Sequence, residues 1–224
     1  NKQVGGEMKG EANMKRWIYG IVLCLCVCGL LAVLGLGAFA ADTVASGTCG
    51  KGVTWSLDDA GALTISGVGA MNDYSASTDM PWYAHRDAVK SIAVEDGVMR
   101  VGSHAFSFFT ALERVNISAS VTSVGSFAFD GCSALKYVTF SEGLTSIEGG
   151  AFFNCTALKG FVLPESVEVI GSYAFKGCKT MTYIELPQHM TSIGKSAFEE
   201  CEKLLSVTIP KGVLVVEEKT FAYC

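Results

Sequence analysis

A residue pattern that recurs every 23 residues is the feature that most constrains how this chain can fold. A phenylalanine column shows the period most clearly, and its members are Phe106, Phe129, Phe152, Phe175, Phe198 and Phe221. An aliphatic column from Val101 to Val216 keeps the same step, without an insertion. A fixed period of this length is typical of a solenoid, in which each unit is a small structure that packs only against its neighbours.

Each unit reads L-x-x-V-x-I-P-x-x-V-T-S-I-G-x-x-A-F-x-x-C-x-x. Apolar residues two positions apart, such as Val138 and Phe140, predict a short strand with one buried face. A second extended piece is expected at 145–147. Glycines such as Gly125 follow this piece, and we expect them to permit the turn because glycine adopts unusual backbone angles at low cost. The Ala-Phe and Cys positions then fall in compact turns or single-turn helices, so the sequence predicts a repeat solenoid.

A different pattern precedes the repeats. Thr54-Trp55-Ser56-Leu57 and Leu63-Thr64-Ile65 flank Asp58-Asp59-Ala60-Gly61, which predicts a β-hairpin. The first coil of a solenoid needs a cover for its apolar end, so we expect this hairpin, with Trp55, to be an N-terminal cap. The expected organisation is a β cap at 41–88 and six repeats of 23 residues at 89–224, the last of them truncated.

The repeat V-T-S-I-G-x-x-A-F-x-x-C-x-x-L, which runs from Ile92 to Cys224, resembles the BspA-type (Treponema-type) leucine-rich repeat of bacterial surface proteins. The preceding segment contains Gly47-Thr48-Cys49-Gly50 and Pro81-Trp82-Tyr83, and it is similar to a segment common in such proteins of gut bacteria. The resemblance implies a curved, leucine-rich-repeat-like solenoid on a cell surface, with adhesion to host or matrix proteins as its role. It identifies no ligand.

The N-terminal residues have the pattern of an export signal. Met14, Lys15 and Arg16 supply a start and positive charge, an apolar run follows, and Ala38-Phe39-Ala40 fits the rule for signal peptidase. We therefore assign 1–13 to sequence upstream of the start and 14–40 to a signal peptide. The run is also long enough for an uncleaved membrane anchor, and this alternative stays open. Either assignment predicts a secreted or cell-surface protein that meets a membrane only through this segment.

Cysteines form a further column with the same period: Cys132, Cys155, Cys178, Cys201 and Cys224. Phe109 takes the equivalent place in the first unit, and neither a C-x-x-C motif nor a column of histidines accompanies the cysteines. We interpret the column as a ladder of small buried side chains, because parallel side chains one coil apart have poor disulfide geometry and no metal-ligand spacing is present.

No residue set in the sequence has the pattern of a catalytic, cofactor or metal site. The chain has only three histidines, and two of these, His104 and His189, occupy variable positions of the repeat. Its net charge is −5 and its Lys and Arg residues are scattered singly, whereas nucleic-acid binding needs a clustered basic face. We expect neither an enzyme nor a nucleic-acid partner.

The outward residues of the first strand in each unit are the candidate ligand-binding residues, and we expect this strand to line the concave face. They are Arg114, Asn116, Tyr137, Thr139, Tyr183 and Glu185. Tyrosine and arginine are the residue types most enriched at binding hot spots, although ordinary solvent-facing strands contain them too.

The sequence thus predicts an extracellular leucine-rich-repeat binding or adhesion module that recognises a protein or glycan through the solenoid face. Host matrix proteins are among the expected ligands. The alternative is a passive spacer that displays a catalytic or anchoring domain located beyond Cys224.

Overall fold

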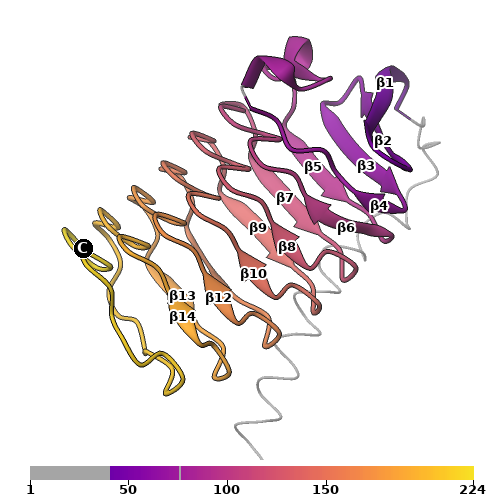
Figure 1. Cartoon of the computed structure of the whole chain (residues 1–224). Coiled ribbons are helices and arrows are strands. Elements are labelled where there is room, and N and C mark those ends of the chain that lie inside the picture. Colours follow the sequence, from indigo (N-terminus) through magenta and orange to yellow (C-terminus); the bar gives the residue numbers. More distant parts are fainter. Residues whose placement is uncertain (1–40, 76) are drawn as a thin grey trace, which may run out of the picture. The chain divides into compact units, whose positions relative to one another are not determined.

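Stacked coils of 23 residues build the body of the protein in the computed structural model (Figure 1). The structure describes residues 41–75 and 77–224, and the stretch from Ala41 to Cys224 is one unit. The predicted upstream and export segments, 1–13 and 14–40, lie outside the described residues. Within the described part, no helix has the length and apolar character needed to cross a membrane.

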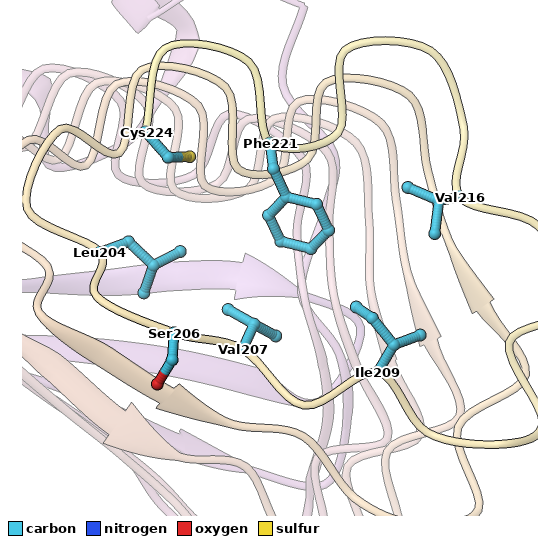
Figure 2. Close-up of a pocket in the computed structure, with 7 residues that line it drawn as sticks. All are labelled: Leu204, Ser206, Val207, Ile209, Val216, Phe221 and Cys224. Atoms are coloured by element: carbon cyan, nitrogen blue, oxygen red, sulfur yellow. The ribbon is translucent and has the colours of Figure 1, made fainter.

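Each coil before the last contributes its first strand to one side of the solenoid, whereas the last coil, whose Val207 and Ile209 are drawn in Figure 2, has no strand. These strands are β5 (Ser91–Val94), β7 (Arg114–Ile117), β9 (Tyr137–Phe140), β11 (Gly160–Val162) and β13 (Tyr183–Glu185). The strands β5, β7 and β9 continue a six-stranded sheet in the order β1-β2-β3-β5-β7-β9, and β11 and β13 form a separate pair. The pairing is parallel and in register, since Arg114 lies opposite Ser91 on one side and Tyr137 on the other.

Another six-stranded sheet, in the order β14-β12-β10-β8-β6-β4, contains the second strand of each coil before the last and the strand β4 that precedes the first coil. Its strands are β4 (Gly69–Ala70), β6 (Val98–Val101), β8 (Ser123–Val124), β10 (Ser146–Ile147), β12 (Val169–Ile170) and β14 (Ser192–Ile193). Threonines at the start of these strands reinforce the sheet, because the Thr145 hydroxyl donates to the Thr122 carbonyl at 3.0 Å. The short strands and the solenoid predicted from the period are therefore confirmed.

The Ala-Phe segment closes each coil as a turn. Of the two conformations expected for it, the structure has the compact turn, since the described repeats contain no helix. The backbone nitrogen of Phe129 donates to the Ala151 carbonyl of the next coil at 2.8 Å, and Phe152 donates to Ala174 in the same way. These bonds bind the coils to each other on a third side, where no strand is present.

Phenylalanine rings form the central stack of the core. The ring centroids of Phe129 and Phe152 are 5.1 Å apart, those of Phe152 and Phe175 5.4 Å, and the second pair of planes differs by 2°. The stack runs from Phe106 to Phe221 with 5.1–5.5 Å between successive rings. Since burial of one phenylalanine stabilises a fold by about 1.5–3 kcal/mol, this column is the main apolar support of the array.

The cap contains the predicted hairpin and one additional strand. In the hairpin, β2 (Val53–Asp58) pairs antiparallel with β3 (Ala62–Gly67), and Trp55 lies opposite Ile65. The additional strand, β1 (Thr43–Gly50), covers the outer edge of β2, and β3 pairs in parallel with β5 of the first coil. Two 3₁₀ turns follow, η1 (Ser77–Asp79) and η2 (Tyr83–His85). Trp55 is 5% exposed, as expected for a cap residue.

The repeat cysteines are unpaired and form the predicted ladder. Four of them are fully buried, and only Cys224 in the last coil is exposed. Each thiol donates to the phenylalanine carbonyl of the preceding coil, as Cys155 does to Phe129 at 3.1 Å. Burial raises the pKa of Cys201 to about 12 and that of Cys155 well above its usual range. These thiols are structural donors held in the neutral form.

The glycines after the second strand act by a different mechanism from the one expected. Gly125 and Gly194 do not adopt positive φ angles. Instead, a Cβ atom at Gly125 would lie 2.6 Å from the Ser103 nitrogen, and one at Gly194 would lie 2.4 Å from the Ser172 nitrogen. These glycines are therefore needed for close approach of adjacent coils, and the explanation by turn conformation was wrong.

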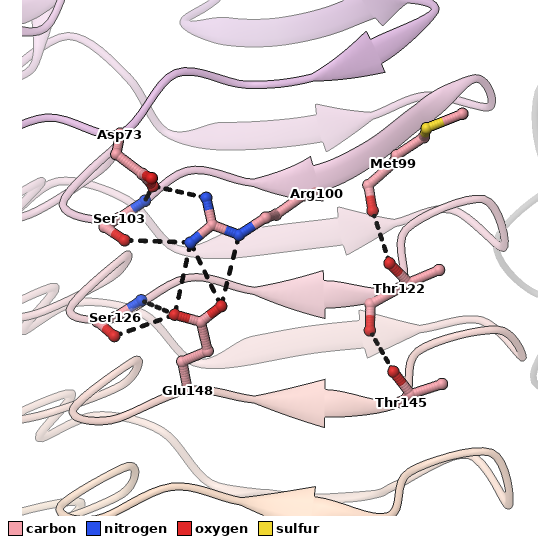
Figure 3. A network of polar contacts seen from close by, with 8 residues as sticks. All are labelled: Asp73, Met99, Arg100, Ser103, Thr122, Ser126, Thr145 and Glu148. Atoms are coloured by element: carbon pink, nitrogen blue, oxygen red, sulfur yellow. Dashed lines mark hydrogen bonds and ion pairs between the residues drawn. The ribbon is translucent and has the colours of Figure 1, made fainter.

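A polar network ties the cap to the third coil (Figure 3). The Arg100 guanidinium donates to Asp73 of the cap at 2.6 Å and to Glu148 at 3.3 Å. Glu148 also accepts hydrogen bonds from the nitrogen and the hydroxyl of Ser126, at 3.1 and 3.0 Å. Glu148 occupies the repeat position at which other coils have a glycine, as at Gly125 and Gly194. This exception supplies the carboxylate that Arg100 contacts from two coils away.

Candidate ligand-binding face

The six predicted binding residues lie on the outer side of the first strands, and we call them the strand face: Arg114, Asn116, Tyr137, Thr139, Tyr183 and Glu185. All six are exposed, because side chains alternate along a strand and Val115, Val138 and Ile184 point into the core between them. Tyr137 and Tyr183 are 51% and 49% exposed, a large fraction for aromatic side chains.

The structure brings four of these residues together in one sheet. Arg114 pairs with Tyr137 and Asn116 pairs with Thr139 in the register of β7 and β9. Tyr183 and Glu185 are on β13, in the separate two-stranded sheet, opposite Gly160 and Val162 of β11. The coil of β11 still adjoins that of β9, because the Lys159 nitrogen donates to the Lys136 carbonyl at 3.4 Å.

Tyr137 is held by a lysine of the next coil. The Lys159 ammonium lies 3.2 Å from the Tyr137 hydroxyl and 5.2 Å from the centroid of its ring. A cation so close to an aromatic ring is attracted by the electrons of the ring face. The contact joins Tyr137 to the next coil and brings a positive charge to the strand face.

Tyr183 lies over a glycine of the preceding coil. A Cβ atom at Gly160 would lie 2.8 Å from the Tyr183 ring, so any larger residue at position 160 would displace this ring. Gly160 is the in-register partner of Tyr183 and is 23 residues after Tyr137. The absence of a side chain at Gly160 therefore provides the space that the Tyr183 ring occupies.

A hollow of about 440 Å³ lies where the strands β9, β11 and β13 begin. We call it the lysine hollow, and its lining residues are Lys136, Ala157, Lys159, Thr180, Thr182 and Lys203. Lys136 and Lys159 directly precede Tyr137 and Gly160, so the hollow borders the strand face. Sequence reasoning missed this site by treating the lysines as scattered. The spacing of 23 residues from Lys136 to Lys159 was the signal that could have found it.

The described residues hold no group of three or more His, Cys, Asp or Glu side chains that could bind a metal ion. Of the variable histidines, His189 is exposed, whereas His104 is half-buried and stacks on Phe127 with 5.3 Å between the ring centroids. The strand face and the lysine hollow together offer aromatic rings, ammonium groups and hydroxyls, which are groups suited to binding.

Comparison with models of protein families shows the family to which the chain belongs. The model of the BspA-type leucine-rich repeat region matches residues 99–224 in six copies. The chain belongs to this family. Its solenoid and the phenylalanine and cysteine columns are therefore those of a BspA-type leucine-rich-repeat protein, as the sequence resemblance predicted. A search of curated proteins found no match.

Solved structures of bacterial leucine-rich-repeat proteins are similar to this BspA-type chain. A leucine-rich repeat protein from Eubacterium ventriosum is 28% identical with a TM-score of 0.66, and the match covers 75% of this chain and 45% of that one. The Treponema pallidum leucine-rich repeat protein is 31% identical with a TM-score of 0.56, and the match covers 74% and 72%. A protein from Bacteroides ovatus, at 24% identity and a TM-score of 0.53, shares the fold. The chain thus spans less than half of the Eubacterium ventriosum protein.

Proposed function

We propose that this protein is an extracellular binding or adhesion module that recognises a protein or glycan ligand through the strand face. The observation that carries the proposal is the pair of half-exposed tyrosines, Tyr137 and Tyr183, on the same side of the solenoid, with one strand, β11, between their own strands β9 and β13. Large exposed aromatic side chains give much contact area for little loss of conformational freedom, and they concentrate at binding hot spots. Membership of the leucine-rich-repeat family supports interaction through the repeats.

The rigidity of the face also supports binding. Its strand β7 pairs in parallel with β5 and β9, and β13 pairs in parallel with β11. The buried residues Val115, Val138 and Ile184 lie beneath the face. A surface that is ordered before binding loses little further entropy when a ligand arrives. The N-terminal export pattern predicts a secreted or cell-surface location, and such a location would expose this face to host matrix proteins and glycans.

The test uses the Tyr137→Ala/Tyr183→Ala double variant in a binding screen against immobilised matrix proteins and glycans. We expect wild-type protein to bind at least one ligand and the variant to lose at least tenfold in affinity, because hot-spot truncations cost about 2 kcal/mol or more. Val169→Ala is the control, since Val169 is 37% exposed on the other sheet. Binding that is equal in all three proteins would contradict the proposal and favour the passive spacer.

A further inference from the structure

The lysine hollow brings positive charge together in an acidic protein. The chain has a net charge of −5, yet three of the six residues that line the hollow are lysines and none is acidic. Lys136 is paired with Glu113 at 3.2 Å. In the described structure neither Lys159 nor Lys203 has a carboxylate within ion-pair distance. Two cations without a paired anion thus face the same space.

The lysines of the hollow follow one another along the axis of the solenoid. Lys136 and Lys159 occupy one column of the repeat, with Thr182 next in it, whereas Lys203 is in the adjacent column after Ala157 and Thr180. Lys136 and Lys203 are 67 residues apart, which is nearly three steps of the repeat. Adjacent parallel strands are about 4.8 Å apart, so the row extends over roughly 14 Å along the axis of the solenoid. A linear ligand with several negative groups matches a row of this length better than a single small anion does.

The tyrosines beside the hollow indicate what kind of linear ligand fits. The Lys159 ammonium contacts the Tyr137 hydroxyl at 3.2 Å, so the charged row and the aromatic face are continuous. The Tyr183 ring lies against Gly160, directly after Thr182 of the hollow, and 49% of the side chain is exposed. Sugar rings have an apolar C–H side that packs on an aromatic ring, and their carboxylate or sulfate groups form charge-assisted hydrogen bonds with lysine.

We propose that the lysine hollow binds the carboxylate or sulfate groups of an acidic glycan, whose sugar rings lie across Tyr137 and Tyr183. This inference rests on the proposed function and specifies its ligand class. Lys159 and Lys203 supply the charge, and the Thr182 side chain, which is exposed at the hollow, supplies a hydroxyl. Recognition then combines a charged row that selects polyanions with two rings that select sugars over acidic peptides.

The test compares the wild-type full chain with Lys159→Gln/Lys203→Gln and with the control Lys51→Gln/Lys211→Gln. The control removes two exposed lysines outside the hollow, so the change in net charge is the same. The probes are heparin and polygalacturonate as acidic glycans, dextran as a neutral glycan, and poly-glutamate as an acidic peptide. Melting curves establish that all the proteins are folded.

We expect wild-type protein to bind an acidic glycan more tightly than dextran or poly-glutamate. The hollow variant should lose about tenfold or more in affinity, whereas the control should stay within about threefold of wild type. The inference is overturned if the hollow variant and the control bind acidic glycans equally, or if poly-glutamate binds as tightly as the glycans do. If acidic glycans fail to bind while another ligand depends on Tyr137 and Tyr183, this inference fails and the proposed function stands.

Discussion

The indole ring of Trp82 stacks on the phenyl ring of Phe106, with 5.2 Å between the ring centroids and 17° between the planes. Trp82 is fully buried, and its indole nitrogen donates to the Ala105 carbonyl at 2.9 Å. The ring of Trp55 meets it edge-on at 5.7 Å. Trp82 thus extends the central stack by one ring beyond Phe106, and the cap joins the repeats through this ring.

Replacement of Trp82 by alanine should weaken the whole array from its N-terminal end. We expect the free energy of unfolding to fall by about 3–5 kcal/mol, the usual cost of truncating a large buried aromatic residue. Trp82→Phe keeps a stacked ring and removes the hydrogen bond to Ala105, so this control should lose only part of that amount. Urea unfolding followed by circular dichroism measures the free energy of unfolding of both variants. Equal losses would show that the stacked ring does not account for the stabilisation by Trp82.

Truncation in the middle of the stack should be as costly. Phe152 lies between Phe129 and Phe175, and its replacement by alanine removes both stacked contacts and the edge-on contact with Phe140. We expect a loss of about 3–5 kcal/mol, which lowers the melting temperature by roughly 10 °C in a domain of this size. Tyr223→Ala is the control, since Tyr223 is 74% exposed, and its melt should match that of wild type. An unchanged melt for Phe152→Ala would refute the register of the repeat.

The cysteine ladder should react with thiol reagents in two stages. Cys224 is exposed, whereas Cys132, Cys155, Cys178 and Cys201 are fully buried and burial raises their pKa values, so few thiolates form. We expect native protein treated with iodoacetamide at pH 8 to be labelled rapidly at Cys224 and slowly at the other four ladder cysteines, as peptide mapping by mass spectrometry would show. In denaturant without reductant all five should react. Resistance there would reveal disulfides that the structure does not contain.

The polar network at Arg100 should make stability depend on pH in the acidic range. A hydrogen bond from the Ser103 nitrogen, together with Arg100, holds the pKa of Asp73 below its usual value. Asp73 therefore stabilises the folded state above about pH 4, its unfolded value, and this contribution is lost as the pH falls through the lower folded pKa. Thermal melts of wild type and Asp73→Asn should differ at pH 6 and converge near pH 2. A constant difference would contradict the role of the charge.

Arg100, the residue at the centre of this network, can be tested separately. Arg100→Met keeps an unbranched apolar stem but removes the guanidinium and its bonds to Asp73 and Glu148, both of which are partly exposed. We expect a loss of about 1–2 kcal/mol, since hydrogen bonds to charged groups at such positions are worth about that amount. Lys195→Met is the control, because its exposed pair with Glu218 should contribute little. Chemical unfolding measures both, and equal effects would argue against a special role for Arg100.

The period in the sequence predicted most of the fold because each column of the repeat experiences the same surroundings in every coil. Phe152 and Cys155 could be placed in the core from their spacing alone, and the structure buries both. The role of Trp82 was not predicted, since it lies 24 residues before Phe106 and so falls outside the period. The strand β1 was also missed, because no repeated pattern marks it.

The candidate site could be predicted only in part. Alternation along a strand identified Tyr137 and Tyr183 as exposed, and the structure places both on the outer side. The lysine hollow depends on side chains of successive coils that converge across turns, and spacing within one unit does not show this convergence. The contact of Lys159 with Tyr137 and the cover of Gly160 by Tyr183 likewise depend on how neighbouring coils are offset.

The identical step between coils also has a consequence for the gene. Because each coil repeats the same hydrogen bonds and ring contacts, 23 codons form a unit that unequal crossing-over can add or delete without loss of reading frame or core. Such an event leaves the Trp82 cap unchanged and alters the number of positions in the column of Lys136, Lys159 and Thr182. Related lineages can therefore lengthen or shorten their ligand row by recombination, while point mutations tune the chemistry of each position.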